Sequence, residues 1–185
     1  MAATASTVER AISGTRADVE TLIREVWPHA FRIASGILRD RALAEDAAQE
    51  ACAIVYLEIP KLRSSRAFSV WFYRIVAREA LALRRRSPAP VEPCEAPVDG
   101  RRETDSSVAR LDLVSALGRL STTQRTAVVL HFYAGLNSRE IAAVLRMPDS
   151  SVRFHLMRAR RALERLLHDD GDAARAFSEA AAGAS

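Results

Sequence analysis

Apolar residues recur at helical spacing along most of the chain, and they predict two separate groups of helices. Between about residues 17 and 86, and again between about 108 and 168, apolar positions follow one another three or four residues apart. We see no useful stretch in which apolar and polar residues alternate as they would in a half-buried strand. The sequence therefore predicts an all-α protein with two small helical domains.

Proline and acidic residues separate the two groups. The segment 87–107 contains four of the seven prolines and can bury little surface, so we expect a flexible Pro-rich linker. Residues 1–16 are expected to form a disordered N-terminus. Residues 169–185 form an Ala-rich tail, which should extend the last helix a little and then fray.

In the first domain, one apolar stripe predicts a long helix, and two prolines mark its irregularities. Pro28 interrupts the stripe and suggests a kink or a break, and Pro60 ends the helix that begins near Leu43. A polar loop then leads to a last helix from Phe68 to Arg86. The stripe consists of Val19, Leu22, Ile23, Val26, Ala30, Ile33 and Ile37.

In the second domain, local signals set the helix ends. A Ser or Asn followed three residues later by Gln or Glu predicts a capping box, and a glycine after an apolar run predicts a C-cap. A stripe that includes Leu117 and Leu120 precedes these signals. They are Ser121 with Gln124, Gly135, Asn137 with Glu140, and Pro148 with Asp149.

The last two helices predict a DNA-binding helix-turn-helix. They show the arrangement that places one helix in the major groove: a short capped helix, a tight turn and then a longer basic helix. In the long helix the stripe Val152, Leu156, Ala159, Leu163 and Leu166 faces the core. We assign base contacts to Ser150, Ser151, Arg153, Phe154 and His155, and phosphate contacts to Arg158 and Arg161.

The helix that begins at Phe68 is a second candidate site for nucleic acid. Trp71, Phe72 and Tyr73 are consecutive, so they cannot all face one core, and at least one is expected to be exposed. Exposed aromatic rings beside arginines suit the stacking of single-stranded bases. The alternative is a core helix with one aromatic residue at its edge, and the pattern alone does not choose between them.

An acidic helix face, formed by Glu45, Asp46, Gln49 and Glu50, is a third candidate site. It lacks a histidine or a third ligand cluster, so a protein-binding face is favoured over metal binding or acid–base catalysis. The two cysteines, Cys52 and Cys94, lack zinc-ligand spacing, and no cofactor is expected. Without an apolar signal core or a run that could span a bilayer, we expect a cytoplasmic protein with no membrane insertion.

Charge changes this picture little. The net charge is +4, and nearly all basic residues are arginine, with Lys61 as the one lysine. Arginine suits phosphate and guanine, but a GC-rich genome would also raise its frequency. Only the placement of the arginines is therefore informative.

Together these motifs resemble a two-domain sigma factor of the extracytoplasmic-function (ECF) class of the sigma-70 superfamily. LAEDAAQE resembles the family's acidic segment, FSVWFYRIVAREALALRRR its −10 helix, and GLNSREIAAVLRMPDSSVRFHLMRARRAL its −35 reader. The resemblance implies that residues 17–86 form a domain like sigma region 2 and residues 108–168 a domain like sigma region 4. Together these domains would direct promoter recognition, melting and initiation. The polymerase supplies the chemistry, so the chain is not expected to be an enzyme.

The resemblance also implies partners and residue roles. The partners are promoter DNA, an anti-sigma factor, and the RNA polymerase core through its β′ clamp helices and β flap. Core binding falls on Asp46, Gln49 and Glu50, and the loop from Arg63 to Ala67 would capture a flipped base. The implied −10 and melting residues are Arg66, Trp71, Tyr73, Arg74, Arg78, Arg84, Arg85 and Arg86.

The sequence departs from the family pattern at positions that matter for DNA recognition. Ala77 and Arg78 stand where the family usually has Arg and Asn, and Arg146 replaces the turn glycine. Phe154 and His155 replace a Ser-Arg pair in the base-reading segment. The promoter sequence read by this helix is therefore expected to differ from the common one.

Two other classes of protein fit parts of the pattern. A stand-alone helix-turn-helix regulator would bind DNA without polymerase, as a dimer on a palindrome. A helical interaction protein would show no salt-dependent affinity for nucleic acid. The acidic face and the aromatic cluster favour the sigma factor over the stand-alone regulator.

Overall fold

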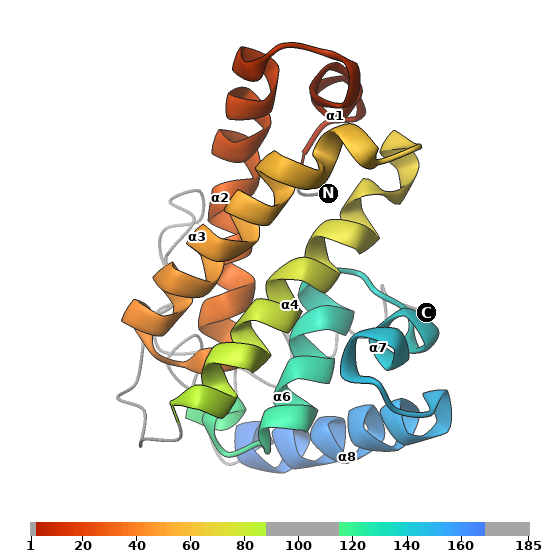
Figure 1. Cartoon of the computed structure of the whole chain (residues 1–185). Coiled ribbons are helices and arrows are strands. Elements are labelled where there is room, and N and C mark those ends of the chain that lie inside the picture. The colour runs from red at the N-terminus through yellow and green to blue at the C-terminus, as the bar shows by residue number, and fades with distance from the viewer. Residues whose placement is uncertain (1–2, 88–114, 169–185) are drawn as a thin grey trace. The chain divides into compact units, whose positions relative to one another are not determined.

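A computed structural model describes residues 3–87 and 115–168 of the chain (Figure 1). In those two ranges all regular structure is helical, and the chain divides into two compact units, Met1–Glu92 and Pro93–Ser185. The predicted all-α class with two helical domains is confirmed. The first unit contains α1 (Ala5–Ser13), α2 (Arg16–Leu38), α3 (Arg41–Glu58), η1 (Ile59–Lys61), η2 (Ser65–Ala67) and α4 (Phe68–Arg86).

The core of the first unit lies between α2, α3 and α4, each of which packs against the other two. Apolar side chains three or four residues apart on α2 are completely buried there, among them Leu22, Val26 and Ile33. Alanines dominate the buried face of α3, including Ala44, Ala48 and others. Small side chains allow neighbouring helices to approach closely, which fits the close packing expected of a protein core.

Helix α2 continues without a break from Arg16 to Leu38, with Pro28 inside it. Of the kink or break expected at Pro28, the break does not occur. Proline removes one backbone hydrogen bond, but Val26 and Ala30 on either side of it are fully buried. Burial of the flanking turns offsets that loss, and Pro28 itself points to solvent.

The predicted disorder of residues 1–16 is also wrong, because Ala5–Ser13 form α1. The Thr4 hydroxyl accepts a hydrogen bond from the amide of Thr7 and caps this helix. Val8 and Ala11 are buried, and the Thr7 hydroxyl donates to the Glu25 carboxylate on α2 at 2.9 Å. The short apolar face of α1 is thus held by tertiary contacts, which the local composition does not reveal.

The second unit contains α6 (Thr122–Val128), a π-helical turn η3 (Val129–Tyr133), α7 (Ser138–Leu145) and α8 (Asp149–His168). Residues 115–118 are helical as well. Helix α8 packs against both α6 and α7. Ala159 and Leu163 of α8 meet Leu120 and Val128 in one buried cluster, against which Leu156 also packs. These positions of the stripe predicted on α8 therefore face the core, whereas the side chain of Leu166 lies outside the described residues.

The predicted helix ends of the second unit are confirmed. Both capping boxes form: Ser121 accepts from the Gln124 amide, and Asn137 accepts from the Glu140 amide at 3.0 Å. Gly135 has φ 69°, as expected of a left-handed residue after a helix. The linker 88–107, the tail, Cys94, and the stripe positions Val108, Leu111 and Val114 lie outside the described residues.

Arg146 occupies the turn between α7 and α8 with φ 53° and ψ 48°. This is the left-handed conformation that glycine adopts at no steric cost. The turn between α7 and α8 therefore contains a left-handed residue although an arginine stands there. The Arg146 amide donates to the Ala142 carbonyl, and this hydrogen bond closes the last turn of α7.

Candidate polymerase and nucleic-acid interfaces

The solvent-facing side of α8 combines arginines with two apolar side chains. Phe154 is 50% exposed and Met157 is 41% exposed, three residues further along the same side of the helix. Arg158 and Arg161 are exposed at compatible helical spacing. The buried stripe with Val152 and Ala159 lies opposite, so this face is free to enter a groove.

The arginines of α8 differ in their partners. Arg153 forms an ion pair with Asp149 at 3.2 Å, and Arg160 forms one with Glu164 at 2.7 Å. The Arg158 guanidinium lies over the Phe154 ring. Within the described part of the chain, Arg161 forms no ion pair, so its charge is available to an external anion.

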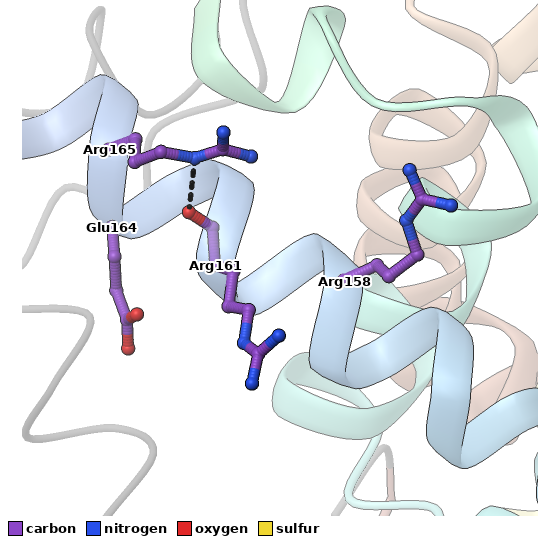
Figure 2. A pocket seen from close by; sticks show the side chains of 4 residues that line it. All are labelled: Arg158, Arg161, Glu164 and Arg165. Carbon is purple, nitrogen blue, oxygen red and sulfur yellow. Dashed lines mark hydrogen bonds between the residues drawn. The ribbon is translucent and has the colours of Figure 1, made fainter.

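A shallow surface hollow follows the C-terminal half of α8 (Figure 2). It is lined by Arg158, Arg161, Glu164 and Arg165, and the Arg165 Nε donates to the Arg161 carbonyl at 3.2 Å. Three of these four side chains are cationic. A hollow of this composition suits phosphate oxygens, because arginine binds them through paired N–H donors.

The N-terminal residues assigned to base contacts are not equally placed. Ser150 and Arg153 are exposed, whereas Ser151 and His155 are partly buried. The Nδ1 of His155 is buried and has no hydrogen-bond partner among the described residues. Ser150 and Phe154 are therefore better placed for base edges than His155.

The aromatic residues of α4 lie mostly in the core, which corrects the expectation of an exposed ring. Tyr73 is only 3% exposed and Phe72 is completely buried, while Trp71 is partly buried. Two consecutive aromatics can both be buried because α4 packs against α2 as well as α3. The predicted contact of Tyr73 with DNA is therefore wrong, and Trp71 is left as the candidate ring.

The basic side chains of the same region are more accessible. Arg66 in η2 and Arg78 on α4 are exposed, and so are Arg85 and Arg86 at the end of that helix. Arg74 and Arg84 are partly buried. Cations in the last turn of a helix are also stabilised by its dipole. Ala77 is completely buried, so the basic residue presented to solvent at this point is Arg78.

The acidic side chains of α3 lie on one solvent-exposed face. Asp46, Gln49 and Glu50 are all exposed, at the spacing that places them together. Glu45 is turned partly inward and forms an ion pair with Arg41 at 3.0 Å. The face continues to Leu57, seven residues after Glu50, whose side chain is 68% exposed.

Other kinds of site find little support in the ranges 3–87 and 115–168. There, no group of three or more His, Cys, Asp or Glu side chains could hold a metal ion. Cys52 is buried, and burial raises the pKa of its thiol to about 11. In the same ranges, no helix combines the length and apolarity needed to cross a bilayer.

Comparison with known proteins assigns both units to one family. Residues 22–88 match sigma-70 region 2, and residues 110–163 match sigma-70, region 4. The ECF RNA polymerase sigma factor SigW of Bacillus subtilis is 30% identical over 142 residues, which cover 68% of this chain and 76% of SigW. The chain belongs to the ECF class of the sigma-70 family. It is therefore an RNA polymerase sigma factor that acts in transcription initiation.

Two further similarities agree with this family. The probable RNA polymerase sigma factor RfaY of Xanthomonas campestris is 30% identical over 142 residues, which cover 69% of this chain but 35% of RfaY. The sigma factor RpoE of Bartonella quintana, solved in complex with the anti-sigma factor NepR, covers 82% of this chain and 97% of its own. That match has a TM-score of 0.67 and 20% identity, and it supports the fold.

Two exposed apolar side chains of this sigma factor lie beside candidate sites but were not predicted from the sequence. Met157 lies on the same side of α8 as Phe154, and Leu57 continues the acidic face of α3. Both could have been found from helical spacing, since each follows a candidate residue by three or seven positions. They were missed because apolar residues are assigned to the core by default.

Proposed function

We propose that the two units of this sigma factor divide promoter recognition between them. In this proposal α8 reads the −35 element, and α4 with the loop before it reads and melts the −10 element. The exposed face of α3 binds the core polymerase. The observation that carries the proposal is the mixed face of α8, where Phe154 lies among exposed arginines, opposite the buried Val152, Ala159 and Leu163.

The division of labour on α8 follows from its geometry. Its N-terminal residues Ser150 and Phe154 would meet base edges, with the Phe154 ring against a thymine methyl group. The hollow lined by Arg158, Arg161 and Arg165 would hold the phosphates beside that groove. Arg153 would contact DNA only after its ion pair with Asp149 opens.

In the first unit, the arginines and Trp71 support a role at the −10 element. Arg66, Arg78, Arg85 and Arg86 are exposed and offer charges for the DNA backbone. Trp71 is accessible enough to contact a base at the edge of the melted region. Arg74 and Arg84 would contribute from partly buried positions.

The acidic face of α3 supports binding to a basic protein surface. The carboxylates of Asp46 and Glu50 would repel DNA phosphates, so this face, with Gln49, suits a protein partner. We assign to it the β′ clamp helices of the core polymerase, and to the second unit the β flap. Leu57 would add an apolar contact at the end of the same face.

These surfaces would also be the targets of regulation. An anti-sigma factor that covers α8 or α4 would block promoter recognition. A protein of the same fold, RpoE, has been solved in complex with the anti-sigma factor NepR. Such a sigma factor would act in the cytoplasm, where the polymerase works. The polymerase would supply all of the chemistry.

Run-off transcription with core polymerase tests the proposal. The measurement compares transcripts from a genomic promoter library with and without this protein. We expect a defined set of promoters to be initiated only when it is present. A protein that binds the same DNA without core polymerase, and adds no specific initiation, would be a stand-alone regulator instead.

A further inference from the structure

Helix α1 packs against the segment that joins α3 to α4. It contacts α2, and it also contacts both short helices of that segment, η1 (Ile59–Lys61) and η2 (Ser65–Ala67). Figure 1 shows α1 at the end of the first unit where α3 leads into α4. The segment 59–67 includes the loop that we propose to capture a flipped −10 base.

One hydrogen bond joins α1 directly to this loop. The Ser65 hydroxyl donates to the Glu9 carboxylate at 3.1 Å, although the two residues are 56 positions apart in the chain. Ser65 precedes Arg66, whose side chain is exposed. A residue on α1 is thus tied to the position next to a proposed DNA contact.

The two ends of the loop are fixed, but its middle is not buried. Ile59 and Phe68 are buried at the two ends. Between them Arg63, Ser64 and Arg66 are exposed. Hydrogen bonds inside the loop close its turns, among them the Ala67 amide to the Ser64 carbonyl at 3.1 Å. These local bonds shape the turns without fixing the loop relative to the helices.

Helix α1 is itself firmly held, so it can serve as an anchor. Val8 and Ala11 are buried, and Thr7 is hydrogen-bonded to Glu25 of α2. The Arg10 Nε also contacts the Asp18 carboxylate of α2 at 3.6 Å. A hydrogen bond donated to an anchored carboxylate restricts the rotation of the donor group.

We infer that α1 positions the base-capturing loop, and that Glu9 is a positioning residue for −10 recognition acting through Ser65. This inference rests on the proposed role of that loop. The carboxylate would act as an acceptor that holds Ser65, and through it Arg66, in the conformation that meets DNA. Its negative charge would not be needed, since an amide oxygen accepts the same hydrogen bond.

The test compares base preference at the −10 and −35 elements separately. Full-length protein with core polymerase is run on promoter libraries randomised at one element or the other. Glu9→Ala and Ser65→Ala should each reduce −10 discrimination by roughly three- to tenfold, the usual worth of one hydrogen bond. Preference at the −35 element, which the second unit reads, should stay the same.

Conservative variants and a double mutant separate positioning from other effects. Glu9→Gln and Ser65→Thr keep an acceptor and a donor, so both should retain wild-type −10 discrimination. The double variant Glu9→Ala with Ser65→Ala should lose no more than either single variant, because both remove one interaction. Glu20→Ala, which removes an exposed carboxylate paired with Arg16 within α2, is the matched control and should discriminate normally.

Several results would overturn the inference. If Glu9→Gln is as impaired as Glu9→Ala, charge rather than the hydrogen bond is responsible. If Ser65→Ala is impaired and Glu9→Ala is not, Ser65 contacts DNA by itself. A wild-type protein that shows −35 preference but none at the −10 element would instead reject the proposed role of the loop, and the inference with it.

Discussion

The guanidinium of Arg158 lies over the ring of Phe154, 5.6 Å from its centroid, on the exposed side of α8. A contact of this kind at an exposed site contributes about 0.5–1 kcal/mol. This energy is enough to favour one conformation of the Arg158 side chain without fixing it. The pair therefore couples the proposed base-reading ring to the first arginine of the hollow that we propose to hold phosphates.

Replacement of Phe154 by Ala should change promoter preference without unfolding the second unit. Loss of one methyl contact of about 0.8 kcal/mol would reduce the preference for thymine at the contacted −35 position by roughly fourfold. Run-off transcription on a library randomised at the −35 element measures this. Arg160→Ala is the matched control, because Arg160 is paired with Glu164 on the flank of the helix. Equal preference in wild type and Phe154→Ala would remove Phe154 from base readout.

Trp71 and Tyr73 should respond differently to truncation, because one ring is accessible and the other is in the core. Tyr73→Ala removes a buried aromatic side chain and should destabilise the first unit by about 3–5 kcal/mol. Trp71→Ala should cost less stability and lower promoter opening. Urea unfolding followed by circular dichroism, together with permanganate footprinting of melted DNA, separates the two effects. A fully stable Tyr73→Ala protein with a melting defect would restore Tyr73 as a DNA contact.

Local signals in the sequence predicted the helices, and the reason is visible at their ends. The Asn137–Glu140 and Ser121–Gln124 boxes involve residues three positions apart, so their hydrogen bonds depend on almost nothing else. The helix Phe68–Arg86 was predicted with the bounds that it has. The exposed positions of α8 were predictable in the same way, since they follow from helical spacing alone.

Features that depend on tertiary packing were not predictable from the sequence. Helix α1 exists because Val8 and Ala11 find a surface formed by residues far away in the chain. Tyr73 is buried because α4 contacts two helices rather than one. Neither arrangement leaves a periodic signature in a short window. The Glu9–Ser65 hydrogen bond belongs to the same class.

Reversal of charge at Asp46 tests the docking face of α3. Asp46→Arg should weaken binding to core polymerase by about tenfold, equivalent to ~1.4 kcal/mol. Fluorescence anisotropy of labelled protein with core polymerase measures the affinity directly. Glu20→Arg makes the same change of charge at an exposed site on α2 and should bind normally. Unchanged affinity of Asp46→Arg would show that the polymerase uses another surface.

Arg125 is expected to stabilise the second unit although it is charged. It is 5% exposed, and its Nη1 donates to the Leu120 carbonyl at 3.2 Å and the Leu117 carbonyl at 3.5 Å. Arg125→Ala would remove this donor from the buried Leu120 carbonyl, at a cost of about 1–3 kcal/mol. The Leu117 carbonyl would still accept from the Leu120 amide at 3.3 Å. Hydrogen exchange of α6 and α8 should therefore accelerate.

The two tryptophans provide an internal control for that variant. Trp27 and Trp71 both lie in the first unit, so tryptophan fluorescence reports on it alone. Urea unfolding of the first unit should be the same in Arg125→Ala and in wild type. Arg119→Ala, at an exposed position, should leave exchange in α6 and α8 as it is. Equal exchange in Arg125→Ala and wild type would mean that the buried guanidinium contributes no net stability.

Cys52 should make stability fall at alkaline pH. Burial raises the pKa of its thiol from 9.0 to about 11, so between these values the unfolded chain has lost the thiol proton while the folded chain still holds it. The unfolded state then binds fewer protons, and the free energy of unfolding decreases as pH rises through this window. Below pH 9 the thiol is protonated in both states and the effect vanishes. Urea unfolding between pH 8 and about pH 11 in a Cys94→Ser background should show this decline, and Cys52→Ala in that background should show less of it.

The same Cys94→Ser protein should react slowly with a thiol reagent at pH 8 when folded, and rapidly in urea, since only the thiolate is nucleophilic. Rapid labelling of the folded protein would place Cys52 in a more accessible environment than the interface between α3 and its neighbours provides.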